Sequence, residues 1–96
     1  MGKQNGKFPY NPAFSVTGSE LRLSRNTFTG RDIQILQKIL NGDKYEAVAS
    51  EFGIGLSTLK KRLTFLFSLL EISDKAHFLE QFENHTILFD DLETTE

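Results

Sequence analysis

Apolar side chains recur at helical spacing along residues 28–82, and turn residues interrupt this pattern. Asn41-Gly42 and Gly53 each follow an apolar stripe, and glycine tolerates the left-handed backbone that ends a helix. A further break precedes Ser73, a residue that favours helix N-caps. The segment is therefore predicted to form four short helices, which are stable only when their apolar stripes pack against one another.

Local signals place the ends of these helices. Thr29 is a good N-cap for the first helix, and Asp32 three residues later resembles a capping box. Asp43 is predicted to cap the second helix in the same way, with Glu46 as its partner. The third helix is expected over about residues 57–70.

The segments outside the helices give weaker signals. Residues 1–26 are expected to be a linker or an N-terminal extension, in which the apolar alternation over 14–23 fits either a short hairpin or an extended, irregular lead. Residues 27–84 are the predicted helical domain, and residues 85–96 an acidic C-terminal tail whose apolar start docks on the core or on a partner. The expected fold class is all-α.

The composition argues against several classes of protein. The chain has no cysteine, which excludes disulfides and thiolate metal sites and suits a reducing cytoplasm. No apolar run is long enough to span a membrane. His77 and His85 are the only histidines, and the carboxylates Asp90 and Asp91 have no environment that would separate their pKa values. We therefore expect a cytoplasmic protein that is not an enzyme, with no metal site and no cofactor.

The charge of the chain is unevenly distributed. The formal net charge is −2, which by itself does not favour nucleic acid as a partner. Residues 84–96, however, contribute four acidic side chains and no lysine or arginine, whereas residues 1–27 contribute four basic side chains and one acidic one. The acidic C-terminus thus offsets an N-terminal part that is positively charged.

The third predicted helix carries two different faces when its residues are spaced at about 100°. One face is an apolar stripe of Leu59, Leu63, Leu66 and Leu70. Lys60, Lys61 and Thr64 lie on the opposite face, which is polar. Arg62 lies at the edge of the stripe, where its stem can pack and its guanidinium can reach outward. The helix is therefore built for burial on one side and for polar contacts on the other.

Aromatic side chains add a second question to this helix. Phe67 lies at the other edge of the apolar stripe and is expected to pack in the core. Phe65 lies between Leu69 and the polar face, so burial and exposure are equally open for it. A basic run such as Lys60-Lys61-Arg62 is usually a solvated face.

The second and third helices are joined by a turn of about four residues that contains glycine, which is a helix-turn-helix arrangement. In that motif the second helix of the pair enters the major groove. Phe28-Thr29-Gly30-Arg31-Asp32 stands where one family has Leu-Thr-x-Arg-Glu, and Thr58-Leu59-Lys60 stands where it has Thr-Val-Lys. Over residues 28–79 the chain resembles the LuxR-type (GerE-like) helix-turn-helix domain of bacterial transcription regulators.

The resemblance implies four helices, of which the second and third bind DNA and the fourth often forms a dimer contact. It implies that the base-contacting positions are Lys60, Lys61 and Thr64, the residues that also lie on the polar face. Thr58, near the start of the same helix, suits a phosphate contact. Arg62 completes the predicted DNA-binding set.

The chain also departs from this family. Arg62 replaces a usual histidine, and Ser68 and Leu69 stand where basic residues are common. Glu46-Ala47 replaces a Lys-Glu pair, and Glu71 replaces a glycine. Fewer phosphate contacts predict weaker DNA binding with a flatter dependence on salt.

Two functions follow as hypotheses. The first is a sequence-specific DNA-binding transcriptional regulator, an effector domain that binds double-stranded DNA as a homodimer. It is expected either to follow an upstream sensory or receiver domain, as such domains usually do, or to be a small stand-alone regulator. The alternative is a protein-interaction or dimerisation module on a degenerate helix-turn-helix scaffold, with weak or no DNA binding. The candidates for dimer or partner contacts are Phe65, Leu69, Phe78 and Phe82.

Overall fold

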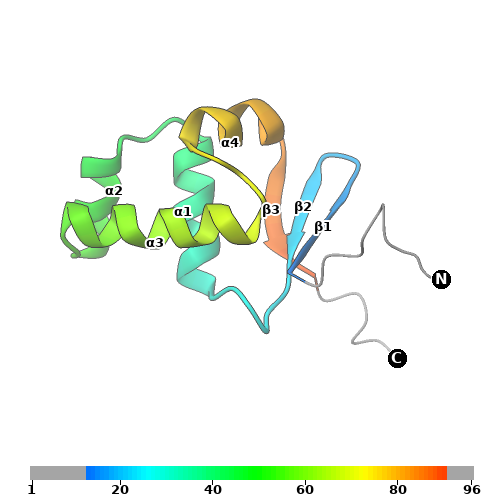
Figure 1. Ribbon diagram of the computed structural model, residues 1–96, viewed down its shortest axis with the longest axis horizontal. Coiled ribbons are helices and arrows are strands. Elements are labelled where there is room, and N and C mark those ends of the chain that lie inside the picture. The colour runs from blue at the N-terminus through cyan, green and yellow to red at the C-terminus, as the bar shows by residue number, and fades with distance from the viewer. Residues whose placement is uncertain (1–12, 91–96) are drawn as a thin grey trace.

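The computed structural model describes residues 13–90, which fold into four helices and a three-stranded mixed sheet (Figure 1). In chain order the elements are β1 (Phe14–Thr17), β2 (Glu20–Leu23), α1 (Gly30–Leu40), α2 (Tyr45–Phe52), α3 (Leu56–Leu69), α4 (Lys75–Phe82) and β3 (Thr86–Phe89). The predicted helices are present, but the all-α fold class is wrong because the sheet belongs to the same folded unit. Within residues 13–90, no helix is long and apolar enough to cross a bilayer.

The sheet joins the two ends of the described chain. β1 and β2 form an antiparallel hairpin around Gly18-Ser19, so the hairpin alternative over 14–23 is the one that forms. Gly18 has a φ of 60°, which suits the first central position of a type II′ turn. β3 then pairs in parallel with β2, with Ile87 opposite Leu21. Residues 86–89, predicted as the start of the acidic tail, are therefore a strand.

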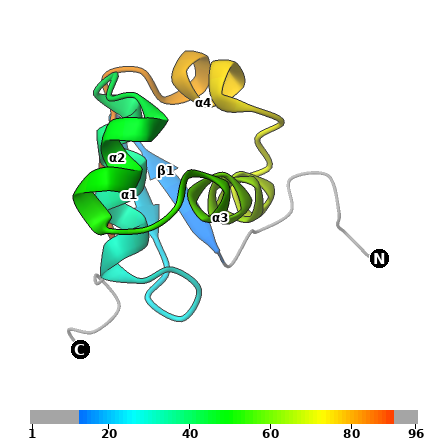
Figure 2. The same ribbon diagram turned by 90° about the vertical axis from the view of Figure 1, so that its left-hand side faces the viewer.

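The core lies between one face of the sheet and the helices. Leu21, Leu23 and Ile87 share that face and are buried. Figure 2 looks along α3 and shows α1, α2 and α4 arranged around it, with the sheet behind them. The four helices cover only one side of the sheet in this arrangement, which is why apolar residues alternate along β2.

Phe78 and Phe82 belong to this core, which corrects their prediction as candidates for a dimer or partner contact. Phe78 is completely buried and packs on Phe67 of α3, with ring centroids 5.1 Å apart. Phe82 is only 4% exposed and contacts both Phe78 and His85. Both rings face inward because they are four residues apart and so lie on the same side of α4.

The helix ends test the capping predictions. The predicted capping box is present at α1, where Asp32 N–H donates to Thr29 Oγ1 at 3.1 Å and Thr29 N–H donates to Asp32 Oδ2 at 3.0 Å. α2 instead has Lys44 as its N-cap without a side-chain hydrogen bond, so the Asp43 cap is wrong. The N-cap of α4 is Asp74 rather than Ser73, because the Asp74 carboxylate accepts from His77 N–H at 2.8 Å.

The chain leaves the C-terminus of α3 through Glu71, a residue with a left-handed backbone. Glu71 has a φ of 62°, a conformation that costs a side-chain-bearing residue more than glycine. Ile72 N–H donates to Phe67 O at 2.8 Å and Glu71 N–H donates to Ser68 O at 3.2 Å. These two bonds form a Schellman motif, which turns the chain toward α4 and buries Ile72.

Candidate nucleic-acid interface

α2 and α3 are consecutive helices joined by the short turn Gly53-Ile54-Gly55. α2 ends at Gly53, whose φ of 67° lets Ile54 N–H donate back to Ala49 O at 3.0 Å. Val48 and Ala49 are buried on the inner side of α2. α3 then begins after Gly55, which makes no side-chain cap bond, so within residues 13–90 no N-cap side chain engages the first backbone N–H groups of α3. This leaves the start of α3 suited to contact with a phosphate.

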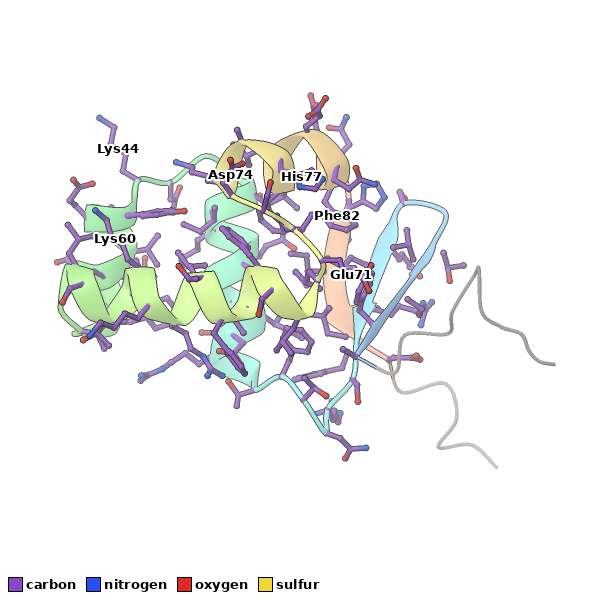
Figure 3. The ribbon with its side chains drawn as sticks, viewed as in Figure 1. Lys44, Lys60, Glu71, Asp74, His77 and Phe82 are labelled. Atoms are coloured by element: carbon purple, nitrogen blue, oxygen red, sulfur yellow. The ribbon has the colours of Figure 1, made fainter. Side chains whose placement is uncertain are left out.

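Two lysines occupy the exposed side of the first half of α3. Lys60 and Lys61 are both exposed, and α3 contains no acidic residue. Figure 3 shows Lys60 at the same end of the molecule as Lys44, which is also exposed at the start of α2. The basic groups thus gather where α2 and α3 meet, away from the sheet.

Lys60 and Thr64 lie on the flank of α3 that faces α4. They line a hollow of about 250 Å³ together with Tyr45 and Lys75. Lys75 Nζ lies 5.0 Å from the centre of the Tyr45 ring. Burial and the nearby Asp74 carboxylate raise the pKa of Tyr45, so its hydroxyl remains protonated as a hydrogen-bond donor at neutral pH.

Thr58 and Arg62 lie on the other flank, which faces α1. They line a second hollow, of about 260 Å³, together with Arg31 and Asp32. The structure therefore separates the predicted DNA-binding residues over two flanks of α3 and its exposed face. Lys60 and Thr64 lie on one side of α3, Thr58 and Arg62 on the other, and Lys61 on the exposed face.

Arg62 is engaged within the protein. Its Nε donates to Asp32 Oδ1 at 2.9 Å, and its terminal NH2 group donates to Asp32 Oδ2 at 2.6 Å. Asp32 is 1% exposed, whereas the Arg62 side chain is 38% exposed. The pair connects α3 to the first turn of α1, where Asp32 also completes the capping box.

The electrostatics of this pair favour both charged forms. Burial by itself would raise the pKa of Asp32, but hydrogen bonds from Arg62 and Thr29 outweigh burial and lower that pKa below its ordinary value. The hydrogen bond to Asp32 in turn raises the pKa of Arg62. The Arg62 guanidinium, which the sequence predicts to contact DNA, thus binds the carboxylate of Asp32, 30 positions earlier in the chain.

Two hydroxyl groups of α3, those of Thr64 and Ser68, donate to the backbone. Thr64 Oγ1 donates to Lys60 O at 3.0 Å, and Ser68 Oγ donates to Phe65 O at 2.6 Å. Each oxygen remains free to accept, but its proton is not directed outward. Thr64 therefore offers its methyl group and an acceptor to a groove, and this combination suits a thymine methyl better than a phosphate.

Phe65 is the large apolar side chain that α3 leaves exposed. It is 47% exposed, and its ring lies 5.2 Å from the Arg62 guanidinium carbon. Leu69, four residues later, is half-buried and packs against the core. The two partner candidates on α3 therefore differ, because Phe65 offers surface and Leu69 mainly fills the edge of the core.

Three basic residues of this region, Arg31, Lys44 and Lys75, are not in the sequence-based set. Each lies outside α3, so the helical wheel of that helix does not include them. The Schellman motif after α3 turns the chain so that α4 begins near α2, and Lys75 of α4 contacts Tyr45 of α2. Only the fold brings Lys75 beside Lys60, so no local pattern would have identified it.

Comparison with protein-family models, with curated proteins and with solved structures finds no match for this chain.

Proposed function

We propose that this chain is a sequence-specific DNA-binding transcriptional regulator, an effector domain that inserts α3 into the major groove. The observation that carries the proposal is the packing of α2 against α3 around Gly53, with Lys60 and Lys61 exposed on an acid-free helix. A recognition helix needs such a face, because lysine donates to guanine O6 and N7 and to phosphates. The LuxR-type resemblance supports the same assignment of α2 and α3.

The structure suggests how the contacts divide. Lys60, Lys61 and Thr64 are the proposed base-facing residues, while Lys44 and Lys75 flank them and suit phosphates. Lys44 and Lys75, each neutralising one phosphate, give a slope of about −1.8 for log affinity against log salt. Arg62 is left out of this set because Asp32 occupies its guanidinium.

Binding to a fluorescent duplex, followed by anisotropy at about 50 mM salt, tests the proposal. We expect Lys61→Ala to weaken binding by about tenfold, because a base contact is worth about 1–3 kcal/mol and about 1.4 kcal/mol corresponds to a factor of ten. Lys38→Ala is the matched control, since it removes the same charge from α1, where Lys38 pairs with Glu51 at 3.0 Å. We expect the control to change affinity by less than about twofold.

Specificity requires a second measurement. Selection from a randomised pool of duplexes should enrich a defined motif, and Lys60→Ala should relax it at one position. Absence of binding to any duplex at low salt would refute the proposal. Equal losses for Lys61→Ala and Lys38→Ala would reduce it to non-specific attraction by charge.

A second candidate function, a protein-interaction module on the same scaffold, rests on Phe65. An exposed aromatic ring on a helix is a common anchor of protein interfaces, and Phe65 is 47% exposed. In this case Phe65→Ser would abolish capture of a protein partner and leave folding unchanged, whereas Lys61→Ala would have little effect on capture. Under the DNA proposal the two substitutions have the opposite ranking in the duplex assay.

A further inference from the structure

β1 is an edge strand whose backbone groups alternate between β2 and the outside. Ser24 N–H donates to Ala13 O at 2.9 Å, and hydrogen-bonded pairs alternate with non-hydrogen-bonded pairs along an antiparallel ladder. Phe14 and Val16 are therefore in non-hydrogen-bonded pairs with β2. Their N–H and C=O groups point outward, and among residues 13–90 no strand lies beyond β1.

At the opposite edge of the sheet, formed by β3, a side chain satisfies an outward backbone group. Ile87 N–H of β3 points outward too, but the side chain of Gln37 on α1 accepts its hydrogen bond at 3.0 Å. β1 has no such cover in the described part of the chain. Its sequence, Phe-Ser-Val-Thr, also contains no charge and no proline, the residues that usually prevent an edge strand from pairing.

We propose that a second copy of this chain pairs with β1 in antiparallel fashion across a twofold axis at Ser15. In this register, Phe14 of one copy lies opposite Val16 of the other, and the two Ser15 residues face each other. Phe14 and Val16 then exchange N–H···O=C bonds on both sides of the axis, which satisfies all the outward groups of these two residues. The product is a continuous six-stranded sheet.

The side chains support the same register. Phe14 and Val16 lie on the face of the sheet that carries the buried Leu21 and Leu23. Val16 is nevertheless 48% exposed, and beside it lies a hollow of about 330 Å³ that Phe14 and Phe82 also line. Val16 of the second copy would stand next to Phe14 over this hollow, an aromatic and β-branched pair of the kind that stabilises sheets.

A second copy fits this edge better than an unrelated strand, because the pattern reads the same after a twofold rotation. In this register each apolar side chain of β1 lies opposite an apolar one, and β1 has no charged side chain that could repel its copy. The interface also lies at the opposite end of the molecule from α2 and the start of α3 (Figure 1). Dimerisation therefore leaves the basic face uncovered, and this inference does not depend on DNA binding.

A single cysteine tests the register, because the natural chain contains none. In the proposed dimer the two Ser15 Cα atoms form a non-hydrogen-bonded pair about 4.5 Å apart, a separation that a disulfide can bridge. We expect Ser15→Cys to give a disulfide-linked dimer under mild oxidation. Thr17→Cys is the matched control on the same strand face, since its two copies would lie about 14 Å apart.

Sedimentation across concentrations from about 10 µM to 1 mM, where small interfaces associate, tests the contact itself. Val16→Pro removes an outward N–H that β2 does not use, so the monomer should fold as before and dimerise at least about tenfold more weakly. Val16→Thr keeps the N–H and should dimerise within about threefold of the natural chain. Circular dichroism confirms that each variant is folded.

Three results would overturn the inference. The first is a chain that remains monomeric over this range, which would mean that another segment or another protein covers the edge of β1, or that the edge stays exposed. The second is equal crosslinking of Ser15→Cys and Thr17→Cys, which would indicate random collision. The third is a Val16→Pro variant that dimerises as tightly as the natural chain, which would place the interface elsewhere.

Discussion

Replacement of Arg62 by methionine should destabilise the fold, although Arg62 lies on the helix proposed to read DNA. Methionine preserves the length of the stem but leaves the Asp32 carboxylate, 1% exposed, without its cation. Breaking a fully buried pair costs about 3–5 kcal/mol. Because the Arg62 side chain is 38% exposed, water can reach the vacated space, and Asp32 keeps its bond from Thr29 N–H. We therefore expect a loss of about 2–3 kcal/mol.

A double-mutant cycle separates the pair from its surroundings. Asp32→Asn keeps an acceptor for Thr29 N–H and leaves Arg62 partly hydrated, so we expect a loss of about 1–2 kcal/mol. The double variant Asp32→Asn/Arg62→Met should lose less than the sum, with a coupling free energy of about 1–2 kcal/mol. Urea unfolding followed by far-UV circular dichroism measures each value, since 2 kcal/mol shifts the midpoint by about 1–2 M in a small domain.

The pH dependence gives an independent check. The pKa of Asp32 is lowered from 3.8 in the folded protein, so the pair stabilises the fold fully above pH 3.8 and progressively less as the pH falls through the folded pKa. In Arg62→Met the unpaired, buried carboxylate should have a raised pKa instead, so protonation relieves its penalty. The difference in stability between the two proteins should therefore shrink between pH 7 and pH 3. A small difference that does not vary with pH would refute the structural role and return Arg62 to the DNA-binding set.

Three further substitutions follow from the structure. Glu71→Gly should raise the free energy of unfolding by about 1 kcal/mol in urea titrations, because glycine adopts a φ of 62° without the cost of a side chain. Gln37→Leu should lower it by about 1–2 kcal/mol by removing the acceptor of Ile87 N–H, whereas Gln34→Leu on the exposed side of α1 should change it little. Glu46→Lys should strengthen duplex binding about tenfold at 50 mM salt and steepen the salt slope by about 0.9, and an unchanged slope would exclude α2 from the interface.

The helical part of the fold was predictable because its signals are local. The Thr29–Asp32 capping box and Gly53 act within a few residues of themselves, and the structure confirms both. The caps of α2 and α4 were each misplaced by one residue, at Asp43 and Ser73. At α4 two adjacent residues, Ser73 and Asp74, satisfy the same local rule, and the structure selects Asp74. At α2 the helix begins after Lys44, which makes no side-chain cap bond, so the local rule does not place this start.

The sheet and the Arg62 pair were not predictable in the same way. β3 is a four-residue apolar stretch whose partner, β2, lies more than 60 positions earlier, and a parallel pair requires the whole α1–α4 segment as its crossover. The sequence predicts that Arg62 contacts DNA because its position at the edge of the apolar stripe lets its guanidinium reach outward. Its partner Asp32 was recognised only as a cap, although a carboxylate can cap a helix and bind a guanidinium at the same time.

The engagement of Arg62 changes what the proposed recognition helix can do. A cation that is held by a buried carboxylate does not release from it for a phosphate without leaving that carboxylate unpaired, which is costly. DNA binding by α3 must therefore come from lysines, which contact phosphates as point charges rather than through a two-pronged fork. In return, the Arg62–Asp32 pair fixes α3 against α1, so the lysine face is presented from a helix whose position is set before any DNA arrives. Under the proposed function, few cations and one internal ion pair would give a weak DNA reader with a shallow salt dependence, and pairing of two copies along β1 would strengthen its binding.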